Sequence, residues 1–302
     1  MKITKLEQML GVLQGEGTKK RLVAAYANDS HTLGAVSDAI DRGIVEAILV
    51  GDEATIQKVC MEEKIDIKKF SRIVQEADEQ KAAAKAVELI NAGEGDILMK
   101  GLVSTDKYMR AILNKEKGLM PPKAILSHVG VMEVSTYHKL IIASDMAIIP
   151  QPDLSQKLAI TNFVIKTAHS LGIEKPKVAL VAATEQMSAG MQACVDAAII
   201  AKMADRGQIK DAYVDGPLAV DVAVDEESVQ IKKLVSTVAG DADALVFPNI
   251  ESGNVFYKTC TKFCKAELAA MVVGAKVPCI LSSRGDSTLT KLYSIALAAI
   301  CA

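Results

Sequence analysis

Short apolar runs and amphipathic segments alternate along almost the whole of this 302-residue chain. The runs are rich in Val, Ile, Leu and Ala, which is typical of strands buried on both faces. We predict strands at 22–26, 47–50, 97–100, 124–127, 140–143, 178–181, 212–214, 244–247, 270–273 and 278–281. The segments between them repeat apolar residues at helical spacing, which predicts helices at 32–42, 54–63, 79–91, 105–117, 154–171, 192–206, 252–265 and from about 288. Strands that alternate with helices in this way indicate βαβ units and a parallel-sheet-rich α/β fold.

Two prolines interrupt the alternation near the middle of the chain. Pro150 and Pro152 follow an apolar run, and Asp153 comes next as a good helix-capping residue. A break at this point leaves two parts of about 150 residues each, which is a common domain size. We therefore expect two domains, with a boundary between residues 149 and 150.

Composition narrows the class of protein. Half of the residues are hydrophobic but only 4% are aromatic and Trp is absent, so aliphatic side chains and Ala must fill the core. A net charge of −2 without a long basic run argues against non-specific nucleic-acid binding. The sequence shows no signal-like apolar core at its start and no run of about 18 apolar residues, so we expect a cytoplasmic protein without a membrane span. The six cysteines lack metal-binding spacing, and we expect reduced thiols and no metal site.

Polar clusters follow several of the predicted strands. They are Lys100 to Thr105, Ser127-His128, Ser144-Asp145 and Ser283-Arg284. In open α/β sheets, ligands bind beyond the carboxyl ends of the strands. The guanidinium of Arg284 suits phosphate or carboxylate oxygens, and a strand–turn–helix unit directs backbone N–H groups to the same point. The last turn therefore predicts an anion site, and its alternative is a plain helix cap made by Asp286 or Ser287.

Three stretches in the second half of the chain resemble the phosphate acetyl/butyryl transferases. They are MADRGQIKDAYVDGPLAVDVAV from Met203, GDADALVFPNIESGN from Gly240 and SSRGDSTLTKLYSIALA from Ser282. Weaker likenesses are LMKGLVST at 98–105, LSHVGVMEV at 126–134 and SDMAIIPQPDLSQK at 144–157. The resemblance spans essentially the whole chain and is closer to the butyryltransferase branch.

This resemblance implies reversible transfer of a short acyl group, butyryl rather than acetyl, between coenzyme A and inorganic phosphate. It implies a two-domain isocitrate/isopropylmalate dehydrogenase-like fold with an inter-domain cleft. Because the last helix returns to the first domain in that fold, the expected domains are 1–149 plus 284–302, and 150–283. Acyl-CoA and phosphate are the expected partners, with coenzyme A as a substrate, no permanently bound cofactor, and a homodimer or higher homo-oligomer as the assembly.

The resemblance also assigns roles to residues. Ser283 and Arg284 match the catalytic Ser-Arg pair, in which Arg284 would hold phosphate and Ser283 would donate a hydrogen bond to the oxyanion or the phosphate. The other expected substrate-binding residues are Lys100, Gly101, Ser104, Thr105, Ser127, His128, Asp145, Glu251, Gly253, Asn254 and Asp286. In the acetyltransferase branch, an acidic residue seven positions after the catalytic Ser is thought to deprotonate coenzyme A, whose thiol must become a thiolate to attack. Here that position is Thr290, so the base stays open between Asp286, Asp145 and Glu185.

Three other readings compete with this one. A metal- and NAD-dependent β-decarboxylating dehydrogenase of the same fold needs converging Asp ligands and a dinucleotide site, and the chain has no GxGxxG motif. An acyl-carrier-protein phosphate acyltransferase is related in sequence. A non-enzymatic two-lobed anion-binding protein would explain Arg284 equally well, but it usually carries an export signal and leaves the family motifs unexplained.

Overall fold

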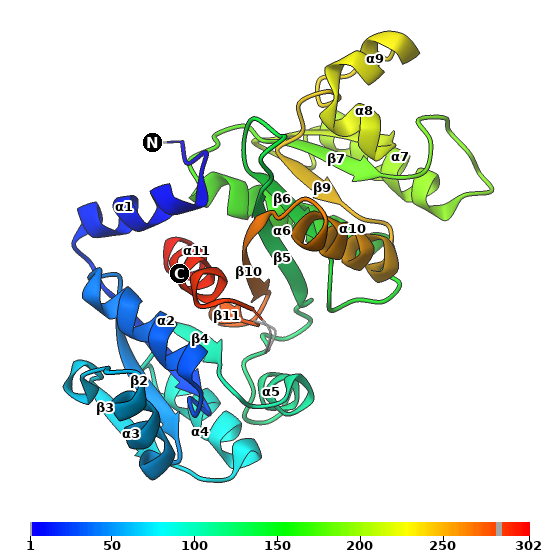
Figure 1. The fold of residues 1–302 in the computed structure, drawn as a ribbon. Helices are drawn as coiled ribbons and strands as arrows, with labels where there is room; N and C mark the ends of the chain where they lie inside the picture. Colours follow the sequence, from blue (N-terminus) through cyan, green and yellow to red (C-terminus); the bar gives the residue numbers. More distant parts are fainter. Residues whose placement is uncertain (1, 282–285) are drawn as a thin grey trace. The chain divides into compact units, whose positions relative to one another are not determined.

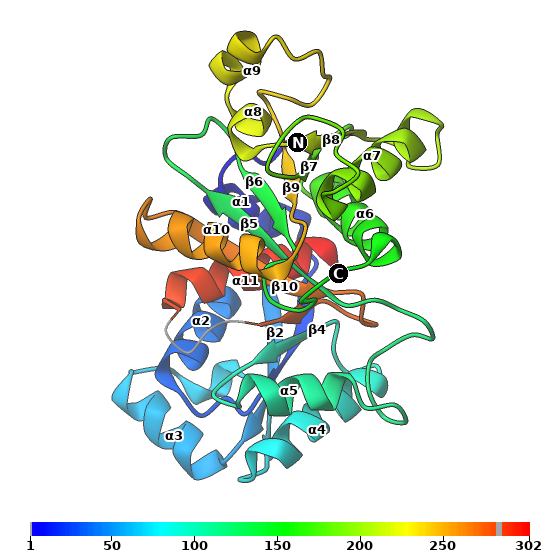
Figure 2. The same ribbon diagram turned by 90° about the vertical axis from the view of Figure 1, so that its right-hand side faces the viewer.

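The computed structural model describes residues 2–281 and 286–302 of the chain (Figures 1 and 2). Contacts between residues divide it into two compact units. We call Glu7–Leu126 together with Ala269–Ala302 the amino-terminal unit, and the chain up to Leu6 together with Ser127–Leu268 the central unit. In Figure 1 the amino-terminal unit runs from blue to cyan and ends in orange and red, whereas the central unit runs from green to gold.

The amino-terminal unit is an α/β layer structure built on a mostly parallel sheet. Its first part contains α1 (Leu6–Glu16), β1 (Lys20–Ala25), α2 (Ser30–Asp41), β2 (Val45–Gly51), α3 (Glu53–Glu62), a 3₁₀ turn (Ile67–Lys69), β3 (Arg72–Gln75), α4 (Glu79–Asn91), β4 (Ile97–Lys100) and α5 (Thr105–Ile112). Its last part contains β10 (Glu267–Val273), β11 (Cys279–Ile280) and α11 (Thr288–Cys301). The strand order is β3-β2-β1-β4-β11-β10, in which β10 alone of these strands pairs antiparallel.

The helices of this unit begin immediately after strands end. Asp29, Asp52 and Asp78 cap α2, α3 and α4, and each side chain accepts a hydrogen bond from the third backbone N–H of its helix. Ser104 and Ser287 cap α5 and α11 in the same way. Because β1, β2, β4 and β11 are parallel, the amino termini of α2, α3, α5 and α11 all follow carboxyl ends of strands at one edge of the sheet. The positive ends of their dipoles favour negative charge at this edge.

The central unit is also an α/β structure in which most of the strands are parallel. Its elements are β5 (Ser127–Glu133), β6 (Ile141–Ser144), α6 (Leu154–Ser170), β7 (Lys177–Val181), α7 (Gln192–Asp205), β8 (Tyr213–Leu218), α8 (Val220–Val224), α9 (Glu226–Lys232), β9 (Ala244–Val246) and α10 (Ile250–Lys262). The strand order is β5-β6-β9-β7-β8, with β6, β9, β7 and β8 parallel and β5 antiparallel to β6. Buried aliphatic residues and Ala fill both cores, as the composition predicts.

Most of the elements predicted from the sequence are present, and the α/β class is confirmed. The strand predicted at 124–127 is wrong, because the strand there runs over 127–133 and contains His128, Gly130 and Glu133, which break up its apolar pattern. The helix predicted at 105–117 ends at Ile112, since Asn114 accepts hydrogen bonds from the backbone of residues 116 and 117 and turns the chain. The helix α1, the edge strand β3 and the short helices α8 and α9 were not predicted, and each carries only a short or interrupted apolar pattern.

The two units differ from the two domains expected from the sequence. The hairpin β5–β6 belongs to the central unit because β6 pairs with β9, and β10 and β11 belong largely to the amino-terminal unit because β11 pairs with β4. A boundary at residues 149–150 as a division between parts that fold separately stays a prediction. Within the described residues, none of the helices combines the length and the apolar character needed to cross a bilayer.

Candidate functional site

The predicted catalytic pair, Ser283 and Arg284, lies outside the described residues. The structure describes the other predicted site residues, which form one group in the amino-terminal unit and a separate polar cluster in the central unit.

The turn after β4 is held tightly against the end of β1. Lys100 is 2% exposed, and its Nζ donates to the carbonyl oxygen of Gly101 over 3.1 Å. The backbone N–H groups of Gly101 and Leu102 donate to the carbonyl oxygens of Ala25 and Tyr26, each over 2.9 Å. A Cβ atom at Gly101 would overlap the carbonyl oxygen of Tyr26 and lie 2.9 Å from that of Ala25. Only glycine allows the turn after β4 to approach the backbone at the end of β1 this closely.

Ser104 and Thr105 open α5. The Ser104 hydroxyl oxygen accepts a hydrogen bond from the backbone N–H of Lys107 over 3.4 Å, which makes Ser104 the helix cap. Its own O–H group can still donate to an anion. Thr105 is exposed at the first position of the helix.

The amino termini of α2 and α11 lie side by side in the same unit. The Nδ1 atom of His31 in the first turn of α2 is 3.4 Å from the Oγ1 atom of Thr288 in α11. One turn further along α11, Lys291 is 3% exposed. Burial lowers the pKa of Lys291, whereas the nearby carboxylates of Asp29 and Asp286 act in the opposite direction. Charged groups of both signs therefore interact at the amino termini of α2 and α11.

The central unit has its own polar cluster, centred on Asp145. This residue is 2% exposed, and its carboxylate accepts hydrogen bonds from the backbone N–H groups of Ala147 and Ile148 over 2.8 and 2.9 Å and of Ile149 over 3.2 Å. The Ser127 hydroxyl donates to Asp145 Oδ2 over 3.1 Å and lies 2.9 Å from the hydroxyl of Ser144. Asp145 therefore holds the turn after β6 in place.

The prediction that Ser127 and His128 follow a strand is wrong, because they begin β5. They still lie at the polar edge, since β5 runs antiparallel to β6 and so brings its amino end to the carboxyl end of β6. Both side chains are buried, His128 with 5% exposed.

The start of α10 packs onto the same turn. Asn249 caps the helix by accepting from the Ser252 N–H over 2.9 Å. Gly253 is buried, and a Cβ atom there would overlap the carbonyl oxygen of Asp145. The Asn254 Nδ2 group donates to the carbonyl oxygen of Met146 over 3.1 Å, while Glu251 is exposed in the first turn. The structure thus brings Ser127, His128, Asp145, Gly253 and Asn254 together within the central unit.

The structure also narrows the set of candidate bases. Asp145 is occupied by its backbone donors, and Glu185 forms an ion pair with Lys232 at 3.1 Å. Lys232 also binds Asp221 over 2.9 Å, and this hydrogen bond lowers the pKa of Asp221.

The Thr290 hydroxyl lies 3.1 Å from that of Ser287, so it takes part in the cap of α11. Of the three bases left open by the sequence, only Asp286 stands beside the predicted catalytic pair in the chain.

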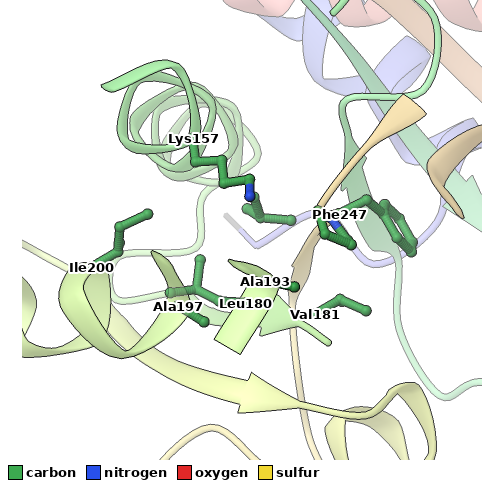
Figure 3. Close-up of a pocket in the computed structure, with 9 residues that line it drawn as sticks. Lys157, Leu180, Val181, Ala193, Ala197, Ile200 and Phe247 are labelled. Carbon is green, nitrogen blue, oxygen red and sulfur yellow. The ribbon is translucent and has the colours of Figure 1, made fainter. Parts of the chain in front are cut away.

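Sequence inspection missed a buried ion pair in the central unit. Lys157 in α6 binds Asp196 in α7 at 2.6 Å, and Gln192 donates to the other oxygen of Asp196 over 2.8 Å. Figure 3 shows Lys157 reaching from α6 toward a small cavity lined by Leu180, Val181, Ala193, Ala197, Ile200 and Phe247. The cavity has about 10 Å³ of space for water, which is room for a single molecule and too little for an acyl chain. The Lys157–Asp196 ion pair therefore links α6 to α7.

Among the described residues, no three His, Cys, Asp or Glu side chains converge to hold a metal ion.

Comparison with known proteins places the chain in a family. A family model described as phosphate acetyl/butaryl transferase matches residues 7–84 and 79–299. The chain is 45% identical to a phosphate butyryltransferase of Clostridium acetobutylicum, over 94% of this chain and 93% of that one. It is 39% identical to a phosphate acetyltransferase of Thermotoga maritima, over 98% of this chain and 99% of that one. The crystal structure of a branched-chain phosphotransacylase from Enterococcus faecalis matches with a TM-score of 0.81 and 31% identity, covering 93% of this chain and 98% of that one. The chain belongs to the phosphate acetyl/butyryl transferase family, and so to a class of acyl-transferring enzymes.

Proposed function

We propose that this protein catalyses reversible transfer of a short acyl group between coenzyme A and inorganic phosphate, with butyryl as the preferred group. The reaction is butyryl-CoA plus phosphate giving butyryl phosphate plus CoA. The observation that carries the proposal is the carboxyl edge of the amino-terminal sheet, where the Lys100–Gly101 turn and the amino termini of α2, α5 and α11 provide positive potential. Both phosphate and an acyl phosphate are anions that such an edge favours.

Each proposed site residue has a role in the acyl transfer. In the direction that forms acyl-CoA, the thiolate attacks the acyl carbonyl carbon, negative charge grows on the carbonyl oxygen, and the C–O bond to phosphate breaks. Arg284 binds the phosphate oxygens and Ser283 donates to the oxyanion, and loss of one such donor commonly reduces the rate by about 10²–10³-fold. Lys100, Ser104, Thr105 and Asp286 complete the anion site, and Gly101 lets backbone approach the ligand. In the central unit, the residues proposed to bind substrate are Ser127, His128, Asp145, Glu251, Gly253 and Asn254.

The acyl group is the finer part of the proposal. Butyryl is favoured by the match to a phosphate butyryltransferase, and acetyl is the alternative because a phosphate acetyltransferase matches nearly as well. One methylene group changes the free energy of discrimination by only about 1–3 kcal/mol, so both acyl groups will react at different rates.

We also propose a cellular compartment and an assembly for the enzyme. It acts in the cytoplasm, where acyl-CoA and phosphate are both present, and coenzyme A serves as a substrate with no permanently bound cofactor. We propose a homodimer or higher homo-oligomer, which sedimentation equilibrium of the purified protein would test. A single species with the mass of one chain would contradict it.

The decisive assay follows release of free thiol from butyryl-CoA by the purified protein. We expect release only when phosphate is added, and faster release from butyryl-CoA than from acetyl-, propionyl- or isobutyryl-CoA. In the same assay Arg284→Ala should raise the phosphate concentration that gives half-maximal rate and should lower kcat. Arg206 is an exposed arginine after α7, and Arg206→Ala should change neither quantity. Thiol release without phosphate would point to a thioesterase. Reduction of NAD with a 2-hydroxy dicarboxylate would instead favour the dehydrogenase.

A further inference from the structure

The reaction needs a group that removes the proton from the thiol of coenzyme A, and this chain has Thr290 where an acidic residue would do so. The following inference rests on the proposed function and concerns that missing base. A base must reach the thiol, so it must be accessible, and its own pKa should lie near the working pH. Asp145 and Glu185 are poorly available to a thiol, because the Asp145 carboxylate is buried among its backbone donors and Glu185 is paired with Lys232.

His31 is an accessible base in the right neighbourhood. It lies in the first turn of α2, its side chain is exposed, and its Nδ1 atom is 3.4 Å from Thr288 Oγ1. A Cβ atom on Gly34, one turn further, would lie 3.6 Å from the methyl carbon of Thr288, so the first turns of α2 and α11 are in contact. Thr288 is two residues before Thr290 in the same turn of α11. His31 thus approaches the segment of the missing acid from another helix.

We infer that His31 is the general base of the acyl transfer and that Thr288 orients its ring. When Nδ1–H donates to the Thr288 hydroxyl, Nε2 carries a free lone pair and is the acceptor. Among the described residues, Thr288 is the hydrogen-bonding partner of this ring. An imidazole ordinarily titrates near about 6.5 and a free thiol near about 8.5, which suits proton transfer at neutral pH better than a carboxylate does.

The proton balance of the step is simple. Nε2 takes the proton from the S–H group, the sulfur forms a bond to the acyl carbon, and the C–O bond to phosphate breaks as phosphate leaves with its electron pair. In the opposite direction the imidazolium returns that proton to the departing CoA thiolate. The step needs no co-reactant beyond the two substrates.

The charged surroundings suit an imidazole that gains a proton during the reaction. Asp29 caps α2 with Oδ1, while its buried Oδ2 has no hydrogen-bond partner among the residues that the structure describes. Asp29, two residues before His31, attracts an imidazolium as it forms, whereas Lys291, which interacts with both Asp29 and Asp286, opposes it. Tyr26, Lys100 and Asp52 are further titratable residues near the start of α2.

The test measures the rate of CoA acylation by butyryl phosphate from about pH 5.5 to 9.5 for the native protein and for His31→Gln. We expect kcat/KM of the native protein to rise with pH through a limb between about 6 and 7, the range of an imidazole. In His31→Gln that limb should vanish and the rate near pH 7 should fall by about 10²–10⁴-fold. The remaining rate should rise tenfold per pH unit up to about 8.5, where the thiol ionises by itself. His138→Gln, which alters an exposed histidine of the central unit, is the matched control and should retain the native profile.

Three further variants test the inference independently. His31→Ala should regain activity when free imidazole is added, in proportion to its neutral form. Thr288→Val should lower kcat while the rate still rises with pH as in the native protein. Thr288→Ser, which keeps the hydroxyl group, should retain the native kcat. An unchanged pH profile in both His31 variants would overturn the inference, as would a higher KM for butyryl phosphate with kcat and its pH dependence unchanged. If the native protein has no phosphate-dependent activity, the proposed function fails first, so the two failures are distinguishable.

Discussion

Two glycines show how single residues shape the polar strand ends in the two units. At Gly101 and at Gly253 a side chain would collide with a backbone carbonyl, of Tyr26 in one case and of Asp145 in the other. Neither position has a positive φ angle, so the requirement is for close approach and not for an unusual backbone conformation. These glycines let a strand end or a helix start lie directly against its neighbour.

The cost of a methyl group at Gly101 can be measured. Gly101→Ala should reduce the free energy of unfolding by about 1–3 kcal/mol, because the backbone of β1 cannot move aside without losing sheet hydrogen bonds. Gly11→Ala is the control, since a Cβ atom there meets nothing within 4 Å inside helix α1. It should stabilise the protein by about 0.5–1 kcal/mol. Urea unfolding of both variants would show the difference, and equal effects would contradict this account of Gly101.

At the scale of elements, ion pairs fasten the amino ends of strands in the central unit. Lys139 before β6 binds both Asp241 and Asp243 at 2.8 Å, and Lys177 at the start of β7 binds Asp241 at 2.9 Å. Asp243 also accepts the backbone N–H of Lys177 over 2.8 Å. The loop before β9 is thereby tied to both of the strands that flank β9 in the sheet.

This ion-pair cluster should make stability depend on pH in the acid range. Burial by itself would raise the pKa of Asp241, but the hydrogen bonds from Lys139 and Lys177 outweigh it and hold that pKa well below its usual range. A carboxylate with a lowered pKa contributes stability above its unfolded pKa of about 3.9, and this contribution is lost as the pH falls toward the folded value. Asp241→Asn should therefore lower stability at pH 7 and flatten its decline below pH 4.

Unfolding by urea at several pH values would measure this effect. Because the Asp241 side chain is 40% exposed, solvent screening will keep the effect modest. Asp205→Asn is the control. The Asp205 side chain is 62% exposed, so its ion pair with Lys202 should contribute little to stability at any pH. A decline in acid that is the same for the native protein and Asp241→Asn would remove Asp241 as its cause.

At the scale of the whole molecule, the function requires the folded chain to bind two different anions. A ligand that binds only the folded state stabilises the protein by mass action, by about 2.7 kcal/mol at one hundred times its dissociation constant. Substrate binding should therefore be visible in the thermal stability of the entire protein, whatever the contribution of each unit.

We expect coenzyme A to raise the midpoint of thermal unfolding in a concentration-dependent way. Phosphate should raise it further, and Arg284→Ala should lose most of the phosphate effect while keeping the effect of coenzyme A. Differential scanning fluorimetry with each ligand would test this, with NAD as the comparison ligand. Stabilisation by NAD and none by coenzyme A would contradict the proposed function.

Much of the fold could be read from the sequence because parallel strands buried on both faces leave continuous apolar runs. The strand at Ile97–Lys100 and the helix at Glu79–Asn91 were predicted to the residue. The candidate site stays a prediction. Strand ends and family motifs pointed to Lys100, Gly101 and the Ser127–Asp145 cluster, but they did not reveal which groups are already occupied by hydrogen bonds.

Local sequence patterns specify the alternation of strands and helices, the Asp and Ser caps and the motifs that define the family, because each depends on neighbours within a few residues. Tertiary structure decided the antiparallel entry of β5, the saturation of Asp145 and the meeting of His31 with Thr288, which are 257 residues apart in the chain. Such contacts depend on which strands pair and which helices pack together. A local sequence pattern does not specify which distant strands and helices become partners.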